Sequence, residues 1–409
     1  MQKNKLYIFL LSICVCFGIL SSFYTSKKIT FSEITKRRFS LKEDFVSIKI
    51  FSQLKVQAFT FSSNAGTYSL WANGIEVLNS SQNPIIKLSY SNDSIEVKTF
   101  ESTIGKFKRI KISSGDESKS FRLKLILPDR KPRIYDDNLI IETELGNLKC
   151  TNEIVLDNYI AGVVQAESGR RSYAEFYKVQ AILARTFALS HLQKHGAENF
   201  NLCDYTHCQA YFGRTTELEI MRAVTDTKGR VVVDDNLNLI DAAFHSNSGG
   251  QTANSEDVWG KRLPYLRSVN DTFSTKMPNA YWERKMAKED WLSYLKLKHN
   301  FPIQDSNARW AATNFKQDIR KTYLEANNVR VPLKNVRNDL QLKSTFFSII
   351  PQGDTLIFKG RGFGHGVGMC QEGAMKMAKL GYKHTDVINF YYQNIQLIDL
   401  HKLHFFKDE

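Results

Sequence analysis

The sequence predicts an α+β fold in which a β-rich N-terminal region precedes a mixed α/β domain. Between residues 46 and 148, short alternating or β-branched segments are separated by Asn, Asp, Gly and Ser turns. From about residue 156, the apolar residues follow helical spacing. The chain has 409 residues, 42% of them hydrophobic and 24% charged, which is enough for two or three domains. We place a leader at 1–26, the β-rich region at 27–148 and the α/β domain at 149–409.

The leader has the pattern of a secretory signal or a membrane anchor. Lys3 and Lys5 precede an uncharged, largely apolar stretch at residues 6–26, and Lys27 and Lys28 follow it. A basic start before an apolar segment is typical of export signals, and the stretch is nearly long enough to remain as an anchor. No Ala-x-Ala cleavage site follows, so both interpretations stay open. We expect an exported protein of the periplasm or cell envelope, attached to the membrane if the leader is retained.

The net charge of +14 and the pI near 9.3 suit nucleic acid, anionic lipid or an anionic cell-wall polymer as a partner. The sequence has no arginine-rich tract, zinc-finger spacing or aromatic RNA-binding motif, and we therefore expect no nucleic-acid partner. Beyond the leader the cysteines are Cys150, Cys203, Cys208 and Cys370, too few for a disulfide scaffold in a chain of this length.

The β-rich region contains a series of predicted strands. They are "VSIKIF", "KVQAFTF", "TYSLWANG", "SIEVKTF", "FKRIKIS", "FRLKLIL" and "NLIIETEL". The segment "FRLKLILPDR" alternates apolar and basic residues, which predicts a strand with one face toward solvent.

Two helices are predicted next, over 157–167 and 173–194. Asp157 is placed to cap the first helix, and Ser168 and Gly169 to end it. Glu167 follows Val163 and Ile160 at helical spacing, so its carboxylate projects from an apolar face. A carboxylate there either pairs with a cation or has a raised pKa, unless the helix end turns it outward into water.

Arg185 lies on the apolar stripe of the second helix, between Ile182 and Leu189. Burying one charge alone is costly, whereas burying opposite charges together costs much less. Two interpretations therefore remain: Glu167 and Arg185 form a structural salt bridge, or they belong to a shared functional site.

The later elements alternate between strands, loops and helices. Strands are predicted in "GRVVVDD", "LIDAAFHSNSGG", "TFFSII" and "DTLIFKG", and helices in "AMKMAKLG" and "HTDVINFYYQN". Residues 272–340 read as a charged helical insertion.

Three stretches carry residues suited to chemistry. "GRGFGHGVGMCQEGA" packs five glycines into residues 360–368 around His365, which predicts a site wall or a proton-carrying group, or only a tight connection. "HSNSGG" places His245, Ser246 and Ser248 after an apolar strand, where they can hydrogen-bond a sugar or peptide.

The third stretch contains Cys203, His207 and Cys208, with His195 upstream. Thiolate and imidazole together favour zinc, and a disulfide between the two cysteines is the alternative in an exported protein.

Taken together, the chain resembles the SpoIID/LytB family of stage II sporulation protein D and amidase-enhancer proteins. The matching stretches are "LDNYIAGVVQAE", "KVQAILARTFAL", "CDYTHCQAYFG", "FHSNSGGQT", "VWGKRLPYLRSV" and "GRGFGHGVGMCQEGA", in family order over about residues 150–400. Departures are Ser168-Gly169 after the glutamate, Phe363 in place of Trp or Tyr, and Cys370 in place of Ser.

The resemblance implies a lytic transglycosylase that cuts the β-1,4 bond between N-acetylmuramic acid and N-acetylglucosamine in peptide-stripped glycan strands. It implies Glu167 as the acid/base and Arg185 as an active-site arginine at substrate distance. The residues implied to line the groove are His245, Ser246, Ser248, Gly249, Gly250, Tyr265, Gly364, His365 and Gln371. The Cys/His cluster, with ligands Cys203, His207, Cys208 and His195, matches a structural zinc segment found in some members.

A hydrolytic glycosidase needs two carboxylates, whereas a lytic transglycosylase can use one, because the sugar's own 6-hydroxyl is the nucleophile. One glutamate on an apolar face suits that reaction and needs no cofactor for the chemistry. The alternative is a non-catalytic peptidoglycan-binding protein that recruits or enhances a cell-wall amidase.

Overall fold

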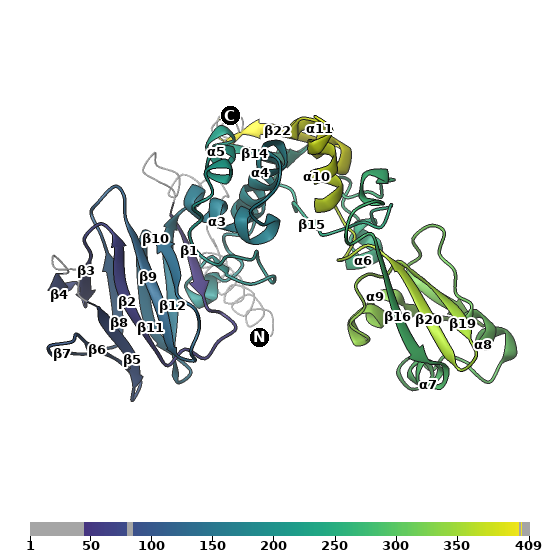
Figure 1. The fold of residues 1–409 in the computed structure, drawn as a ribbon, viewed down its shortest axis with the longest axis horizontal. Helices are drawn as coiled ribbons and strands as arrows, with labels where there is room; N and C mark the ends of the chain where they lie inside the picture. Colours follow the sequence, from purple (N-terminus) through teal and green to yellow (C-terminus); the bar gives the residue numbers. More distant parts are fainter. Residues whose placement is uncertain (1–44, 80–84, 401, 403–409) are drawn as a thin grey trace, which may run out of the picture. The chain divides into compact units, whose positions relative to one another are not determined.

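The computed structural model describes residues 45–79, 85–400 and 402, and the predicted leader at 1–26 lies outside them. Among these residues no helix is long and apolar enough to cross a membrane. The fold is α+β, as expected, and the strands of the N-terminal region form two sheets (Figure 1).

The first sheet has seven strands and is antiparallel except at one edge, where β1 and β13 run parallel. Its order is β13 (Leu202–Cys203), β1 (Phe45–Ile50), β12 (Asn147–Val155), β11 (Asn138–Glu144), β8 (Arg109–Ser113), β3 (Ser69–Ala72) and β4 (Ile75–Asn79). The edge strand β13 comes from the α/β part of the chain, so the two parts share a sheet.

The second sheet is antiparallel and has six strands. Its order is β10 (Arg133–Asp136), β9 (Ser120–Leu127), β2 (Ala58–Ala65), β5 (Ile86–Ser91), β6 (Ser94–Lys98) and β7 (Thr103–Phe107). Strand β9 alternates buried and accessible side chains along most of its length, which confirms the prediction of one solvent-facing side.

The two sheets bury their facing side chains against each other, and β6 contacts β8 and β11 of the first sheet. Aromatic rings on the second sheet continue this core toward the α/β part. Phe61 stacks on Phe121 at 5.3 Å between ring centroids, Phe121 on Tyr135 at 5.8 Å, and Tyr135 contacts Tyr211 at 5.9 Å. Tyr211 belongs to the loop after β13, so the core extends beneath the candidate site.

The α/β part is built around α4 (Ala174–Ser190), which is buried on most sides. It contacts α3 (Leu156–Ser168), α5 (Leu218–Asp226), α10 (Gln371–Lys379), α11 (His384–Tyr391) and β14 (Arg230–Asp234). Strand β14 pairs with β22 (Ile395–Asp399), and β15 (Phe244–His245) pairs with β21 (Met369–Cys370). The short elements are η1 (Gly196–Glu198), α6 (Ser255–Trp259) and η2 (Thr272–Ser274).

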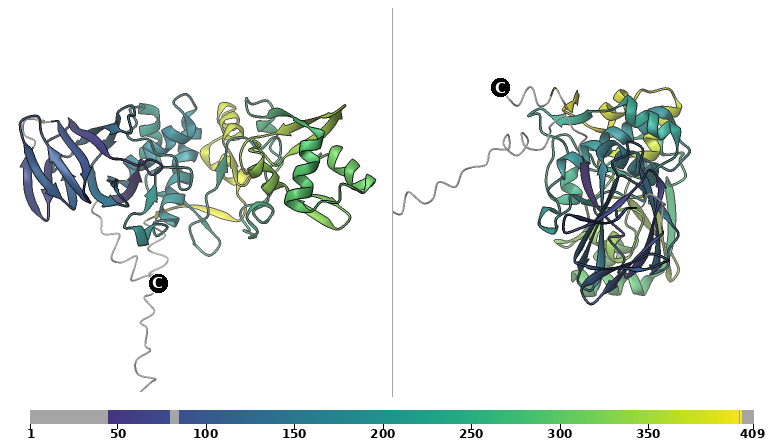
Figure 2. Two further views of the ribbon diagram at one scale, coloured as in Figure 1. Left: turned by 90° about the horizontal axis from the view of Figure 1, so that it is seen from below. Right: turned by 90° about the vertical axis from the view of Figure 1, so that its left-hand side faces the viewer.

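Residues 281–361 form a mixed subdomain with its own apolar core around Trp291 and Phe358 (green in Figure 2). A three-stranded sheet of order β16 (Tyr281–Ala287), β20 (Thr355–Arg361) and β19 (Phe347–Gln352) packs with helices and a hairpin. The remaining elements are α7 (Lys288–His299), α8 (Ser306–Thr313), β17 (Tyr323–Ala326), β18 (Val329–Pro332) and α9 (Leu333–Asp339).

The predicted elements differ from the structure in three places. The expected break at 148/149 falls inside β12, which is continuous because it pairs with both β1 and β11. The helical insertion expected at 272–340 is mixed, since β16 pairs with β20 from beyond its predicted end. The strand expected over 239–250 is only the two residues of β15, because the rest turns back against the glycine-rich segment.

Candidate active site and metal centre

Glu167 lies in the last turn of α3, which ends at Ser168 with Gly169 as the C-cap at φ 73°. The prediction for the helix end is therefore confirmed. Its Oε1 accepts a hydrogen bond of 2.7 Å from the backbone N–H of Ala210. The side chain is half-buried, and no described residue bonds its second carboxyl oxygen. One oxygen is held in place and the other remains open to a ligand.

Burial raises the pKa of Glu167 above its ordinary value, and the Ala210 N–H only partly opposes this effect. No charged group contributes to the shift of this pKa. The carboxyl group is therefore a lone acid in a desolvated setting, which favours its protonated form and suits a proton donor.

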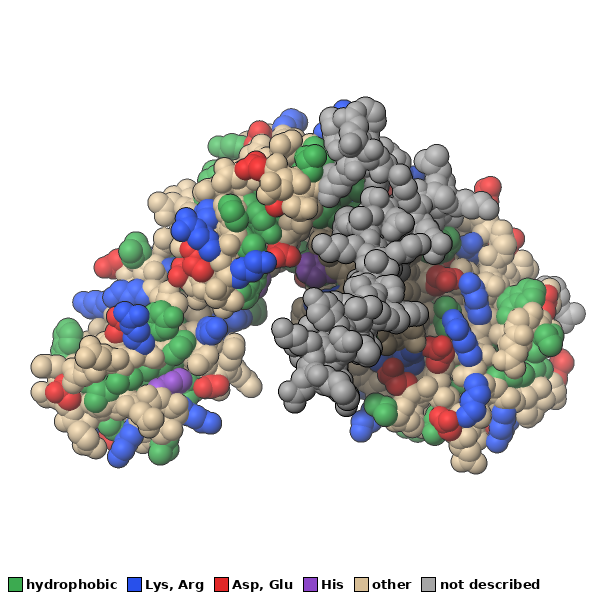
Figure 3. All heavy atoms as spheres, turned by 180° about the vertical axis from the view of Figure 1, so that it is seen from behind, with side chains coloured by type: hydrophobic (Ala, Val, Ile, Leu, Met, Phe, Trp, Pro, Cys, Tyr) green, Lys and Arg blue, Asp and Glu red, His purple; other side chains and the backbone are tan. Residues whose placement is uncertain are grey.

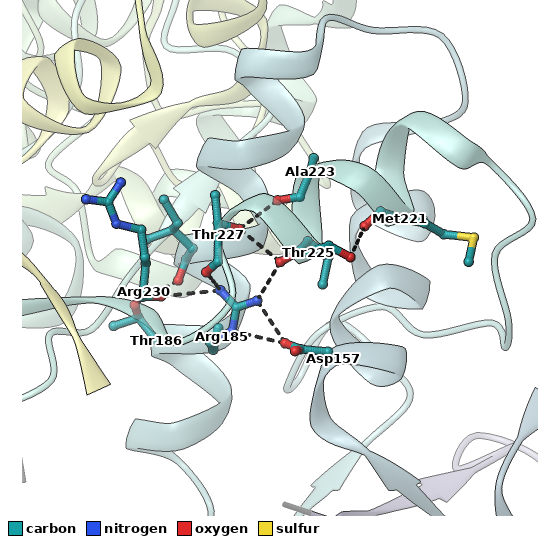
Figure 4. Close-up of polar contacts among 10 residues, drawn as sticks. Asp157, Arg185, Thr186, Met221, Ala223, Thr225, Thr227 and Arg230 are labelled. Carbon is teal, nitrogen blue, oxygen red and sulfur yellow. Dashed lines mark hydrogen bonds and ion pairs between the residues drawn. The ribbon is translucent and has the colours of Figure 1, made fainter. Parts of the chain in front are cut away.

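Arg185 does not reach Glu167, and the prediction that it sits at substrate distance is wrong. The residue is 1% exposed, and all five guanidinium N–H groups have partners in the structure (Figure 4). Nε and Nη2 donate to Asp157 Oδ1 at 3.3 and 2.9 Å, and the remaining N–H groups donate to the carbonyls of Thr227, Arg230 and Val224. No donor is left for a sugar.

The partner of Arg185 is Asp157, in the first turn of α3, and not Glu167 in its last turn. Asp157 does not cap the helix as predicted, because the N-cap is Val155 and makes no side-chain cap bond. Ten residues of helix separate Asp157 from Glu167, a rise of about 15 Å. Arg185 therefore fixes one end of the helix pair and Glu167 lies at the other.

The glycine-rich segment packs backbone to backbone against the Ser248–Gly250 turn. Asn247 and Phe363 exchange two hydrogen bonds of 2.9 and 2.8 Å between their main chains. A Cβ on Gly249 would lie 2.6 Å from the carbonyl carbon of Arg361, and one on Gly362 would lie 2.5 Å from Asn247 O. Both glycines also have positive φ, so this close approach needs glycine at both positions.

Burial lowers the pKa of both His245 and His365, which keeps both rings neutral. Backbone groups bond both ring nitrogens of His365, whereas the buried Nε2 of His245 has no hydrogen-bond partner among the described residues. His365 Nε2 bonds Phe244 O at 2.9 Å and its Nδ1 accepts from Val367 N, while burial lowers its pKa to about 4. His245 is 4% exposed, bonds Val367 O through Nδ1, and burial lowers its pKa well below the usual value. Through these bonds the two histidines connect the glycine-rich segment to strand β15.

Of the other predicted groove residues, Ser248 and Tyr265 are buried, and both form hydrogen bonds within the protein. Ser248 donates to Asp271 Oδ2 at 2.8 Å and is fully buried, so its predicted sugar contact is wrong. Tyr265 is also buried, and its hydroxyl accepts a hydrogen bond from Asp241 N at 3.1 Å. Ser246, Gly250 and Gly364 are half-buried.

Gln371 joins the glycine-rich segment to the acid. Its Nε2 donates to the backbone carbonyl of Glu167 at 3.3 Å and to Gln180 Oε1 at 3.4 Å. Because Gln371 starts α10, it links that helix to the end of α3 and to the first half of α4. The segment from 360 to 371 thus reaches Glu167 only at its last residue.

Sequence reasoning missed a buried carboxylate, Glu372, next to Gln371. Its oxygens accept from Asn247 Nδ2 at 2.6 Å and from Asn279 Nδ2 at 2.6 Å. It ties the loops of Asn247 and Asn279 to the start of α10. Its place in "CQEGA", directly between Gln371 and Gly373, was the available signal.

The four residues predicted to bind metal lie together: His195, Cys203, His207 and Cys208 offer ligand atoms all within 4.8 Å of one another. Cys203 Sγ is 3.8 Å from His207 Nδ1, and Cys208 Sγ is 3.5 Å from His195 Nε2. Tetrahedral zinc with sulfur and nitrogen ligands needs separations of about 3.4 to 3.8 Å. Both cysteines are free thiols, so the alternative disulfide is not formed.

The surroundings of the cluster also fit a metal. His195 Nδ1 lies 2.6 Å from Glu198 Oε1, the carboxylate–histidine arrangement that orients zinc ligands. Asp204, next to Cys203, accepts from Phe51 N at 2.7 Å and from Ser52 Oγ at 2.6 Å. Ala210, two residues after Cys208, donates to Glu167. The cluster therefore shapes the loop that contacts the acid.

Zinc bound by this cluster would be a structural ion, and its removal is expected to lower stability before it affects chemistry. A chelator should lower the unfolding temperature, and zinc should restore it with one ion per chain, measured by calorimetry and native mass spectrometry. The Cys203→Ser variant should lose the response to both reagents, whereas Cys150→Ser should keep it. An unfolding temperature that is unaffected by chelation in the wild-type chain would contradict a structural zinc.

Comparisons with known proteins place these residues in a known family segment. The family model described as SpoIID, stage II sporulation protein, matches residues 144–233, which contain Glu167, Arg185 and the metal cluster. The chain is 31% identical over 260 residues to stage II sporulation protein D of Bacillus subtilis (strain 168), covering 60% of this chain and 74% of that protein. It is 29% identical over 260 residues to the protein of the same name from Bacillus amyloliquefaciens, covering 60% and 74%. It is also 26% identical over 288 residues to the amidase enhancer of Bacillus subtilis (strain 168), covering 58% of this chain and 40% of that protein.

Proposed function

Because the chain belongs to the SpoIID/LytB family, whose members have cell-wall functions, we propose that it is a peptidoglycan lytic transglycosylase. It cleaves the β-1,4 bond between N-acetylmuramic acid and N-acetylglucosamine in glycan strands and leaves a 1,6-anhydro end. The observation that carries the proposal is a single half-buried carboxyl, Glu167, whose pKa is raised by burial and which has one oxygen without a partner.

The reaction follows from the state of that carboxyl. Protonated Glu167 gives its proton to the glycosidic oxygen as the bond to the muramic acid C1 breaks, and positive charge develops on the sugar ring. The resulting carboxylate then takes the proton of the same sugar's 6-hydroxyl, whose oxygen attacks C1. One group serves as acid and then as base, so neither a second carboxylate nor a cofactor is needed for the chemistry.

The Ala210 N–H supports both halves of this cycle. It bonds Oε1 in the ionised and the protonated state, which holds the carboxyl in one orientation and leaves Oε2 to face the sugar. Gln371 holds the backbone carbonyl of Glu167 and so fixes the helix end. We propose the zinc as a structural ion of the same loop.

The product distinguishes this function from others. Purified glycan strands without stem peptides should yield anhydro-muramic ends, identified by mass spectrometry at 18 mass units below the hydrolysed product. Incubation in H₂¹⁸O should introduce no label into those ends, because water is not the nucleophile. Labelled reducing ends would show a hydrolase instead and overturn the proposal.

A second candidate function is recruitment or enhancement of a cell-wall amidase, which the likeness to an amidase enhancer favours. In that case the chain would bind glycan strands without releasing anhydro ends and would raise the rate of an added amidase. We propose that the protein acts in the periplasm or cell envelope, where its substrate is found.

A further inference from the structure

The 281–361 subdomain has a groove on its surface that is formed by none of the residues around Glu167. Its volume is about 610 Å³, which lies within the range of protein sites that hold a small ligand, about 300 to 1,000 Å³. The walls come from the end of α8, the loop that follows it and strand β17. The side chains of these walls that bear on binding are Trp310, Phe315, Lys316, Lys321, Tyr323 and Glu325.

Two aromatic rings of this groove are exposed to solvent. Trp310 is 67% exposed and Tyr323 is 38% exposed. Trp291, in the core of the same subdomain, is fully buried and donates its indole N–H to Ala312 O at 3.0 Å. The Trp310 N–H has no acceptor among the described residues. Flat, exposed rings stack on the apolar faces of sugars, and a free N–H can donate to a sugar oxygen.

Two lysines give the groove a net positive charge. Lys316 and Lys321 are exposed, and in the part of the chain that the structure describes neither forms an ion pair with an Asp or Glu. Lys321 Nζ lies 5.4 Å from the centroid of the Phe315 ring. The acidic residue of the walls, Glu325, pairs with Arg330 at 3.0 Å, so its charge is already offset.

The unpaired lysines are a local feature of this groove. Arg309, next to Trp310 on α8, pairs with Glu289 at 3.0 Å. On the face of the molecule in Figure 3, basic and acidic side chains are likewise interspersed. Exposed cations without a counter-ion attract anions, and salt weakens that attraction. The groove therefore fits a ligand that presents both sugar rings and negative charge.

Hydrogen bonds hold the loop of the groove in place without a ligand. Gln317 is buried, and its Nε2 donates to Thr345 O at 2.9 Å and to Phe347 O at 2.8 Å. Its Oε1 accepts from Lys321 N at 2.8 Å, which fixes the backbone of that lysine. A site that is ordered before binding loses less conformational entropy when the ligand arrives.

We propose that this groove is an accessory binding site for an acidic glycan strand of the cell wall. Trp310 and Tyr323 stack on its sugar rings, and Lys316 and Lys321 bind carboxylates on the sugars or their attached peptides. The inference rests on the proposed function, because that function makes the glycan strand the ligand. A second contact on the same long polymer raises the apparent affinity without any change around Glu167.

The test measures binding of purified peptidoglycan glycan strands in the Glu167→Gln background, where the strands stay uncut. Trp310→Ala should weaken the affinity about tenfold, and Trp310→Phe, which keeps a ring, should retain most of it. The strands should also shield Trp310 from a soluble fluorescence quencher, measured as the difference in quenching between the chains with Trp310 and with Trp310→Phe. Phe100→Ala, which removes a fully exposed ring outside the subdomain, is the control and should leave the affinity unchanged.

The lysines are tested through salt and competition. The double change Lys316→Ala and Lys321→Ala should weaken binding and make the remaining affinity less dependent on ionic strength. Lys296→Ala with Lys298→Ala removes the same charge from α7 and should keep the original salt dependence. If polyglutamate or a phosphodiester-linked wall polymer displaced the strands as well as glycan fragments do, the groove would be a general anion-binding surface and the proposal would be wrong.

The proposal would also be wrong if Trp310→Ala bound the strands as tightly as the Phe100→Ala control, or if the strands did not shield Trp310. Unfolding temperatures verify that each variant is folded. The two proposals fail separately. Anhydro ends released by the wild-type chain, with no effect of Trp310→Ala on affinity, would leave the function and remove the accessory site. A Trp310 dependence of binding without any anhydro ends would leave the accessory site and remove the function.

Discussion

The Glu167→Gln variant is expected to release anhydro-muramic ends about 100- to 10,000-fold more slowly than the wild-type chain. Glutamine keeps the shape of the side chain and can still accept from Ala210 N, but it cannot give a proton to the glycosidic oxygen. Binding of the strand should therefore persist. The measurement is product release by mass spectrometry under single-turnover conditions, with Glu219→Gln on the exposed face of α5 as the control.

The pH dependence gives an independent check on the same residue. Because the acid form is required and burial raises its pKa, the wild-type rate should fall as pH rises through that raised pKa. The native state also holds this proton more tightly than the unfolded chain, so stability falls as pH rises from the ordinary glutamate pKa through the raised one. Glu167→Gln should consequently unfold at a higher temperature than wild type at neutral pH and not in acid. If Glu167→Gln released product at neutral pH as fast as the wild-type chain, Glu167 would be excluded as the acid.

Replacing Arg185 by Leu is expected to lower the free energy of unfolding by about 3 to 5 kcal/mol. The change leaves the Asp157 carboxylate and the carbonyls of Val224, Thr227 and Arg230 without their donor in the protein interior. Urea denaturation measures the loss, and Arg222→Leu on α5 is the control. From its place on α4, the guanidinium bonds groups of α3, of β14 and at the end of α5. The substitution therefore loosens all four elements together.

The same variant separates structural from catalytic roles. At a temperature where Arg185→Leu is still folded, its rate of anhydro-end release should stay within a few-fold of wild type, because Glu167 lies at the other end of α3. If Arg185→Leu were as stable as wild type but inactive, Arg185 would have a catalytic role and not the structural role inferred from its hydrogen bonds.

Helical periodicity located Glu167 and Arg185 on apolar faces but did not show which neighbour each one meets. The loop from 169 to 173 is short, so α3 and α4 must run antiparallel. A residue late in α4 then meets the start of α3, where Asp157 lies, and a residue at the end of α3 meets other elements. Counting from the turn would have paired Arg185 with Asp157 correctly.

Long-range contacts explain what the sequence did not reveal. The donor to Glu167 is a backbone N–H of Ala210, and main-chain groups leave no signature in residue types. The subdomain at 281–361 was misjudged because β16 pairs with a strand some seventy residues later in the chain. The proximity of His195, Cys203, His207 and Cys208 was easier to predict, since three of these four residues lie within six positions and their chemistry is distinctive.

The pairing of β1 with β13 has a consequence for how the protein can be divided. Ile48 and Lys49 run beside Leu202 and Cys203, and Asp204 bonds the turn that follows β1. The segment that contains Cys203 and, further on, Ala210 is thus paired with a strand about 150 residues earlier in the chain. The family-matched region at 144–233 does not include β1, so moving that region alone into another protein would remove the strand that holds the loop between Cys203 and Ala210.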